Sequence, residues 1–302
     1  ITVAGMILVN NSGGKLTYEP LKHAAWNGLT PCDLVFPFFL FIMGISTYIS
    51  LHKFKFEVSQ KVIIKILKRT LVIMLIGWGI NWFAHICNGD FFPFVHLRLT
   101  GVLTRIALCY GIVSLIALFV NHKYILRLVV LLLVGYAFIL CFGNGYMSDE
   151  SNLLSIIDRS LLGSQHLYQK SPIDPEGLAS TLPAIVHTLI GFCCGGVIMR
   201  VKDIDQKVLH LFLIGFVLIV IGWLFSYALP LNKRIWSPTF LCVTCGGASA
   251  LLAMLMYVID IKKKEKWSRF FVVFGVNPLF LYVLSEVLAI VFSRFGVKSM
   301  AY

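Results

Sequence analysis

One histidine, His23, stands in a polar segment directly ahead of a long apolar run, and the segment reads HAAWNGLTPCDLVFP over residues 23–37. An imidazole has an ordinary pKa of about 6.5, so a histidine can act as a nucleophile or a general base near neutral pH. Thr30, Pro31 and Asp33 form the pattern of a helix start, with a capping threonine, a proline at the first position and an acid three residues after the cap. The pattern predicts a helix from about Pro31 with His23 just outside it, although a histidine in a polar loop is more often only solvated.

Two arginines and two acids stand beside other apolar runs. Arg98 and Arg105 are seven residues apart, which predicts one helix face with Arg105 inside the outer leaflet. A cation at that depth usually faces the interior of the bundle or a ligand. The alternative is that its long side chain snorkels, which means that the charged group extends back to the membrane interface. Asp174 and Glu176 precede a further run, where acids favour a helix N-terminus.

The second half of the sequence adds three features. Lys233 lies in a short basic turn, where positive charge on the outer side indicates an anionic partner. Asn277 precedes Pro278 inside an apolar run, which predicts a kink. Glu286 and His187 are ionisable residues within predicted spans, where such residues are functional or hydrogen-bonded packing groups. The eight cysteines, a CxxC pair included, are interpreted as packing residues, and no metal site is predicted.

The composition of the 302 residues sets the class of protein. They are 58% hydrophobic and only 13% charged, which excludes a soluble cytosolic enzyme and a disordered protein. The net charge of +12 would suggest a nucleic-acid partner in a soluble protein, but none is predicted here. We predict an all-α, polytopic transmembrane helical bundle. Nine apolar segments mark its spans: 1–10, 34–52, 66–86, 102–120, 125–143, 179–199, 208–229, 236–259 and 270–293.

Lys and Arg set the predicted orientation of the bundle. Sixteen lie in four short connections and ten in the remaining, longer segments, so the short connections are predicted to be cytoplasmic. The loops 11–32, 87–101, 144–178 and 230–235 then lie on the outer side, together with His23. Residues 1–302 read as a single domain. Because the first segment is short and lacks Met, we expect truncation at both ends, with at least one further span after residue 302.

Taken in order, five motifs resemble the heparan-alpha-glucosaminide N-acetyltransferase family. They are HAAWNGLT at 23–30 with DLVFP at 33–37, GVLTRI at 101–106, DPEG at 174–177, NKRIWS at 232–237 and NPL at 277–279. The resemblance implies an enzyme that moves an acetyl group from acetyl-CoA on the cytoplasmic side to an amino sugar on the far side. Without the lumenal domain of the animal enzyme, the chain resembles a compact bacterial relative in the inner membrane, for which heparan sulfate is a doubtful substrate.

The resemblance also implies roles for residues. The family's catalytic histidine falls on His23, and a second site residue falls on Asn10 or, as an alternative, Asn11. His23 is either the acetyl acceptor or a general base, and Asn10 donates to the oxyanion. Asp33 orients the imidazole, with Asp174 and Glu176 as alternatives. The predicted CoA ligands are Arg105, Lys233 and Asn277, and the predicted acceptor ligands are Trp26, Asn27, Asp174 and Glu176.

Two other functions stay open beside the enzyme. An amino-sugar transporter is the main alternative, supported by the polytopic build and the ionisable residues within spans. A structural membrane scaffold is disfavoured by the polar motifs that cluster on the outer side. Acetyl-CoA, an amino-sugar acceptor and the lipid bilayer are the predicted partners, and a homodimer is left open.

Overall fold

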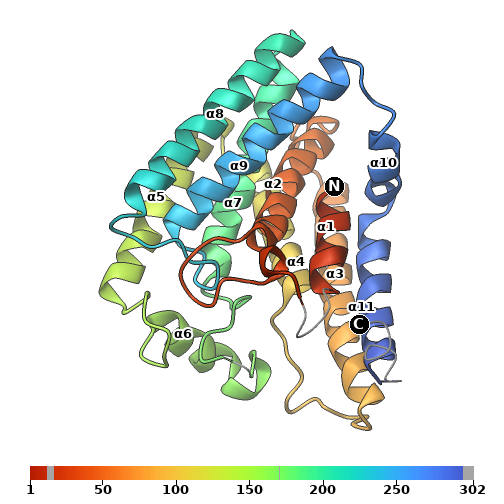
Figure 1. The fold of residues 1–302 in the computed structure, drawn as a ribbon, viewed down its shortest axis with the longest axis vertical. Coiled ribbons are helices and arrows are strands. Elements are labelled where there is room, and N and C mark those ends of the chain that lie inside the picture. Colours follow the sequence, from red (N-terminus) through yellow and green to blue (C-terminus); the bar gives the residue numbers. More distant parts are fainter. Residues whose placement is uncertain (12–16, 170, 295–302) are drawn as a thin grey trace.

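The computed structural model describes residues 1–11, 17–169 and 171–294, and these residues form a bundle of helices with no strand among them (Figure 1). Two short 3-10 turns, Glu19–Leu21 and Ser164–His166, lie in loops, and a π-helical turn, Tyr257–Ile261, continues α9. The α-helices are α1 (Thr2–Asn10), α2 (Pro31–His52), α3 (Gln60–Cys87), α4 (Val102–Phe119), α5 (His122–Phe142), α6 (Leu153–Leu162), α7 (Thr181–Arg200), α8 (Ile204–Phe225), α9 (Pro238–Met256), α10 (Ser268–Val276) and α11 (Pro278–Arg294).

The number of membrane spans is smaller than the sequence predicted. Among the residues that the structure describes, six helices are long and apolar enough to cross a membrane, or up to seven if α10 and α11 are one bent span, so the count of nine is not confirmed. Helix α1 has only nine residues, and the first ten residues of α3 include four cations. Helices α10 and α11 meet at an angle of 84° next to Pro278, where a kink was predicted. The all-helical, multi-pass membrane architecture is confirmed.

The long polar loops gather at one end of the bundle, which is the lower end in Figure 1, around α6. The Trp26 indole donates to the carbonyl of Tyr146 at 3.0 Å, and the Gly28 amide donates to Leu231 at 2.8 Å. These contacts join three loops that are far apart in the sequence. The loops assigned to one side from the distribution of charge therefore do lie together.

Helices α2 and α7 pack with their backbones nearly in contact. A Cβ atom on Gly191 would lie 2.1 Å from the carbonyl oxygen of Phe41, and one on Gly44 would lie 2.1 Å from that of Thr188. Gly191 and Gly195, which have GxxxG spacing, form the α7 side of this close interface. Since Asp33 lies in the first turn of α2, this packing fixes the helix that carries the site described below.

Gly191→Ala is expected to lower the unfolding temperature, because one added methyl group must push α2 and α7 apart. Overpacking of this kind costs about 1–3 kcal/mol. Thermal unfolding in detergent is the measurement, and Gly79→Ala is the matched control, since a Cβ at Gly79 meets nothing within 4 Å. Equal unfolding temperatures for the two variants would contradict the packing described here.

Candidate active site

The carboxylate of Asp33 organises the start of α2. It is 1% exposed and accepts hydrogen bonds from the Thr30 amide at 3.2 Å and the Thr30 hydroxyl at 2.9 Å. The predicted capping box is therefore present. The same oxygen accepts from the Ala24 amide at 3.2 Å, which ties the loop that carries His23 to the helix.

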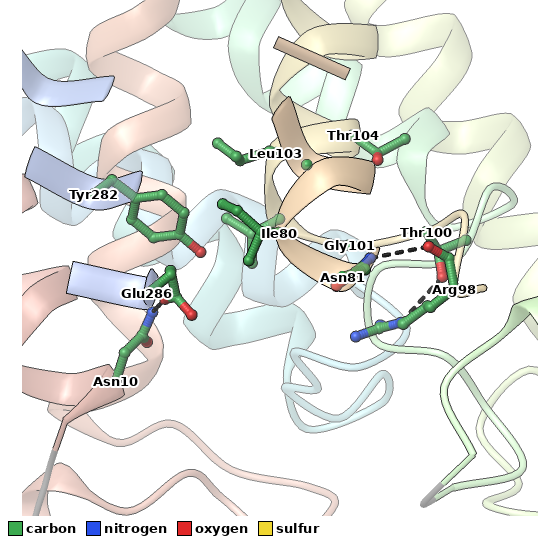
Figure 2. Close-up of a pocket in the computed structure, with 12 residues that line it drawn as sticks. Asn10, Ile80, Asn81, Arg98, Thr100, Gly101, Leu103, Thr104, Tyr282 and Glu286 are labelled. Carbon is green, nitrogen blue, oxygen red and sulfur yellow. Dashed lines mark hydrogen bonds between the residues drawn. The ribbon is translucent and has the colours of Figure 1, made fainter. Parts of the chain in front are cut away.

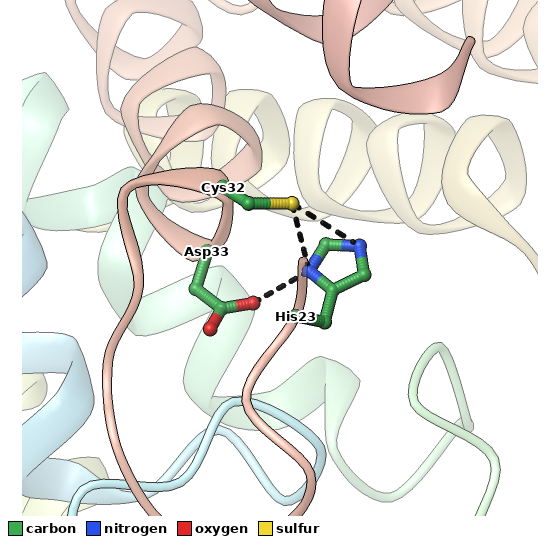
Figure 3. Close-up of side chains that lie close together, drawn as sticks. All are labelled: His23, Cys32 and Asp33. Atoms are coloured by element: carbon green, nitrogen blue, oxygen red, sulfur yellow. Dashed lines mark hydrogen bonds and ion pairs between the residues drawn. The ribbon is translucent and has the colours of Figure 1, made fainter. Parts of the chain in front are cut away.

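His23 lies against this carboxylate, as Figure 3 shows. Its Nδ1 is 2.6 Å from Oδ1 of Asp33, and its side chain is 54% exposed. When Nδ1–H donates to a carboxylate, the other ring nitrogen carries the lone pair. Nε2 of His23 is then the atom available as a base or nucleophile, with Asp33 fixing the ring as predicted.

Lys233 completes the network from a loop 210 residues further along the chain. Its Nζ lies 3.1 Å from Oδ1 of Asp33 and 3.0 Å from Nδ1 of His23. Nδ1 cannot both donate to Asp33 and accept from Lys233, and the shorter contact favours donation to Asp33. The ammonium then compensates the charge of the buried carboxylate. Sequence reasoning assigned Lys233 to CoA, whereas the structure places it in the His23 network.

Cys32 is a neighbour of His23 that sequence reasoning missed. Its Sγ lies 3.1 Å from Nδ1 of His23, and the ligand atoms of His23, Cys32 and Asp33 lie within 4.8 Å of one another. Such a set could hold a metal ion. The Lys233 ammonium, however, lies within 3.1 Å of two of these ligand atoms, where its charge would oppose a metal ion. The arrangement fits acid–base chemistry better. The position of Cys32 in the first helical turn, beside Asp33, was the available signal.

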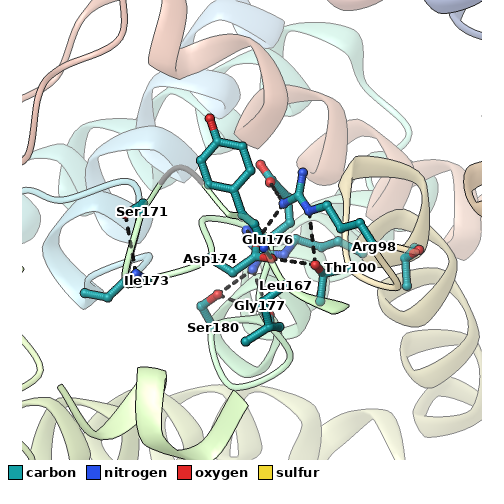
Figure 4. Close-up of polar contacts among 12 residues, drawn as sticks. Arg98, Thr100, Leu167, Ser171, Ile173, Asp174, Glu176, Gly177 and Ser180 are labelled. Atoms are coloured by element: carbon teal, nitrogen blue, oxygen red, sulfur yellow. Dashed lines mark hydrogen bonds and ion pairs between the residues drawn. The ribbon is translucent and has the colours of Figure 1, made fainter. Parts of the chain in front are cut away.

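The two acids predicted to bind the acceptor are paired with Arg98 instead (Figure 4). The guanidinium lies 2.7 Å from Asp174 and 2.8 Å from Glu176, and the Thr100 hydroxyl donates to Asp174 at 2.5 Å. Burial opposes the charged form of Asp174, but the ion pair and the hydrogen bonds outweigh it and lower the pKa. Arg98 precedes α4, so it does not share a helix face with Arg105 as predicted.

Arg105 is enclosed within the bundle. It is 1% exposed, donates to the carbonyl of Gly177 at 3.0 Å, contacts the hydroxyl of Ser180 and lies 5.2 Å above the Trp236 ring. These contacts tie α4 to the start of α7. A CoA phosphate could not reach a side chain so enclosed, so this environment does not fit the predicted role.

The remaining predicted ligands lie apart from His23 or join loops. Asn27 accepts from the amide of Asn232 at 3.1 Å, and the Trp26 indole binds a loop carbonyl, so both hold the loop layer together. Asn277 is exposed at the bend between α10 and α11. None of the three is linked to His23 by a described contact.

Asn10 meets Glu286 rather than His23 in the contacts that the structure describes. The Asn10 amide donates to Oε1 of Glu286 at 2.7 Å. Both residues line a polar cavity of about 220 Å³, opposite Asn81 and Arg98 (Figure 2). They also line a second cavity of about 440 Å³ between the ends of α3 and α11. Sequence reasoning noted Glu286 but did not include it in the site.

An apolar cavity of about 170 Å³ adjoins the polar one, because Leu103 and Tyr282 line both. Val3 and Met6 of α1 form part of its wall, and Arg69 of α3 is its cationic member. The bundle therefore holds a run of cavities that changes from apolar to polar along α1, α3, α4 and α11.

Asp158 of α6 is a buried acid that interacts electrostatically with Asp174, the partner of Arg98. It accepts from the Ala179 amide at 2.8 Å, and burial raises its pKa to about 6. An acid whose pKa is higher in the folded than in the unfolded state destabilises the fold when it ionises. This penalty is absent below about pH 4 and complete above about pH 6.

We therefore expect the pH dependence of stability to change in Asp158→Asn. When the pH falls from 7 to 5, the unfolding temperature of the wild type should rise relative to that of the variant. The reason is that Asp158 takes up a proton in the folded wild type, whereas an asparagine at this position does not titrate. Thermal unfolding in detergent at both pH values is the measurement. Asp149→Asn is the control, because Asp149 is an exposed acid in the same layer of loops, and this variant should follow the wild type. Parallel profiles for all three proteins would contradict the expectation.

The spans and the network of His23, Asp33 and Lys233 define a multi-pass membrane protein with a site suited to acid–base or nucleophilic chemistry. The chain is 28% identical over 341 residues to heparan-alpha-glucosaminide N-acetyltransferase of Mus musculus, and the alignment covers 94% of this chain and 51% of that protein. It is also 28% identical over 340 residues to the Homo sapiens protein of the same name, and this alignment covers 93% of this chain and 50% of the human protein. The chain thus spans about half the length of the curated relatives it matches. No family model matches it.

The resemblance to this family predicted from the five motifs is confirmed by these comparisons. Both relatives carry the name of an N-acetyltransferase, which is the class of enzyme that the motifs indicated. The comparisons give no support to a homodimer.

Proposed function

We propose that this chain is a transmembrane N-acetyltransferase that moves the acetyl group of acetyl-CoA to the amino group of an amino sugar on the outer side of a bacterial inner membrane. One observation carries the proposal: Nδ1 of His23 lies 2.6 Å from the buried carboxylate of Asp33, and the ring is otherwise half exposed. The relatives' names support the reaction class. The grouping of the polar loops at one end, with His23 among them, supports the sidedness.

His23 can serve the reaction in two ways. In the first, Nε2 attacks the thioester carbonyl, the carbon–sulfur bond breaks, and CoA leaves as the thiolate. The neutral amine of the sugar then attacks the acetyl-imidazolium, the bond between the acetyl carbon and Nε2 breaks, and the proton that the amine loses passes to the thiolate as the neutral ring is released. In the second, Nε2 takes a proton from the sugar ammonium, and the free amine attacks the thioester directly. The carbon–sulfur bond then breaks, and CoA leaves as the thiol after taking a second proton from the amine. Asp33 holds the ring in the same tautomer in both.

The side-chain amide of Asn10 has two partners in the structure. It donates to Glu286 at 2.7 Å and forms a second hydrogen bond with Tyr282. For Asn10 to donate to an oxyanion, as we propose, its contact with Tyr282 must open. Lys233 balances the charge of Asp33 at 3.1 Å and so keeps the buried carboxylate ionised.

The cavities suggest where acetyl-CoA lies. The pantetheine arm is long and uncharged and carries a gem-dimethyl group, and the apolar cavity lies between α1, α3 and α4 with Arg69 in its wall. It adjoins the polar cavity that contains Asn10. We place the acetyl end toward Asn10 and the phosphates toward the end of the bundle with the short connections rich in Lys and Arg.

The experiment that tests the proposal is transfer of a radiolabelled acetyl group from acetyl-CoA to glucosamine by the purified full-length protein. Labelled N-acetylglucosamine should form together with an equal amount of free CoA. If the full-length, folded protein forms no labelled amide and binds no acetyl-CoA in calorimetry, the proposal is wrong.

An amino-sugar transporter remains the second candidate, and the cleft beside Glu286 is the observation that favours it. His187 gives it less support than the sequence suggested. That residue is 0% exposed and packs edge to face on Trp236, with ring centroids 5.8 Å apart. It is therefore a packing residue of α7.

A further inference from the structure

Glu286 lies at the junction of the two polar cavities. It is a half-buried carboxylate on α11 that lines both of them, together with Asn10. Figure 2 shows Asn10, Tyr282 and Glu286 on one side of the first cavity and Asn81, Arg98 and Thr100 on the other. Any polar molecule in this cleft would therefore meet the Glu286 carboxylate.

This carboxylate has no cationic partner within the part of the chain that the structure describes. Arg98, across the cavity, is already paired with Asp174 and Glu176. The described contacts of Glu286 are neutral ones, with the amide of Asn10 and the hydroxyl of Tyr282. An ionised carboxylate within a helical membrane bundle is costly unless a cation compensates it. Arg294 lines the second cavity, but no ion pair between it and Glu286 is described, so the carboxylate itself lacks a cationic partner.

The other groups that line the cleft suit a polyhydroxylated ligand. The Asn81 side-chain nitrogen donates to the carbonyl of Arg98 at 2.9 Å, which leaves its oxygen as an acceptor. The hydroxyl of Thr104 and the side chain of Tyr282 line the same cavity. A carboxylate beside several neutral donors and acceptors matches the ammonium group and the hydroxyls of an amino sugar.

We propose that Glu286 binds the ammonium group of the acceptor amino sugar in the cleft between α1, α3 and α11. This proposal rests on the proposed acetyl transfer and adds to it the place where the acceptor enters. Glu286 discriminates protonated amino sugars from neutral sugars of the same shape. The cleft and the apolar cavity then hold the two substrates on either side of Tyr282 and Leu103.

The test is Glu286→Gln in the full-length protein, with Glu57→Gln as the control, because Glu57 is an exposed acid of the same charge outside the cavities. Titration calorimetry measures the binding of glucosamine and of glucose without acetyl-CoA. We expect the wild type and Glu57→Gln to prefer glucosamine. Glu286→Gln should lose at least about tenfold in glucosamine affinity, with acetyl-CoA affinity unchanged.

The outcomes separate this proposal from the proposed function. If the wild type acetylates glucosamine and Glu286→Gln keeps its KM for glucosamine, the acceptor site is wrong and the enzyme assignment stands. If the wild type binds glucosamine through Glu286 but transfers no acetyl group, the site stands and the enzyme assignment fails. If Glu286→Gln does not fold, Glu286→Asp replaces it, because this variant keeps the charge and must then retain the preference for glucosamine over glucose. Loss of that preference only in Glu57→Gln would also overturn the proposal.

Discussion

His23→Ala is expected to abolish acetyl transfer while the protein remains folded and still binds CoA. The side chain is 54% exposed, and its loss should cost roughly 0.5 kcal/mol of stability, as for most surface substitutions. Removal of a nucleophile or general base should lower the rate by at least about a hundredfold. The measurement is acetylation of glucosamine by the purified full-length variant, with release of CoA followed in parallel.

His96→Ala is the matched control, because this histidine is 59% exposed in another loop and also lies beside an aspartate. It should keep the activity of the wild type. Near-normal turnover by His23→Ala would show that His23 is only a loop residue. If His23→Ala fails to fold, His23→Gln retains a hydrogen bond to Asp33 and replaces it in the same comparison.

Asp33→Asn should have the second large effect. The amide can still accept from Thr30 and so preserve the helix start, but it no longer holds Nδ1–H of His23 or compensates Lys233. In a histidine–carboxylate pair of this kind, such a change lowers kcat by up to about ten-thousandfold, because the ring takes the wrong tautomer. We expect a fall of at least about a hundredfold in kcat with little change in acetyl-CoA affinity.

Asp203→Asn is the matched control for helix capping. Asp203 caps α8 by accepting from the Gln206 amide, and it is exposed. Thermal unfolding of both variants separates a capping effect from a catalytic one. If Asp33→Asn and Asp203→Asn have the same kcat, Asp33 only caps α2 and does not orient His23.

The local part of this site could be predicted from the sequence. Thr30 and Asp33 form a capping box within four residues, and His23 is only ten residues from Asp33 along the chain. Contacts of this kind depend on short-range geometry that residue types specify. The exposed imidazole beside a buried carboxylate follows from them.

The long-range part could not be predicted. Lys233 reaches Asp33 and His23 across about two hundred residues, and Asn10 meets Glu286 across 276. Such pairs depend on how whole helices pack, which hydropathy does not specify. The enclosure of Arg105 by α7 is another tertiary effect. The bend between α10 and α11 is a further tertiary feature, since a proline predicts a kink but not an angle of 84°.

The most direct test of the central claim uses the full-length protein in sealed liposomes, with radiolabelled acetyl-CoA on one side and glucosamine on the other. We expect labelled N-acetylglucosamine in the glucosamine compartment, on the side that His23 faces, and a rate at least about a hundredfold lower with His23→Ala. Glucosamine that crosses the membrane unmodified, while all of the acetyl label stays on CoA, would show that the protein is a transporter instead of an acetyltransferase.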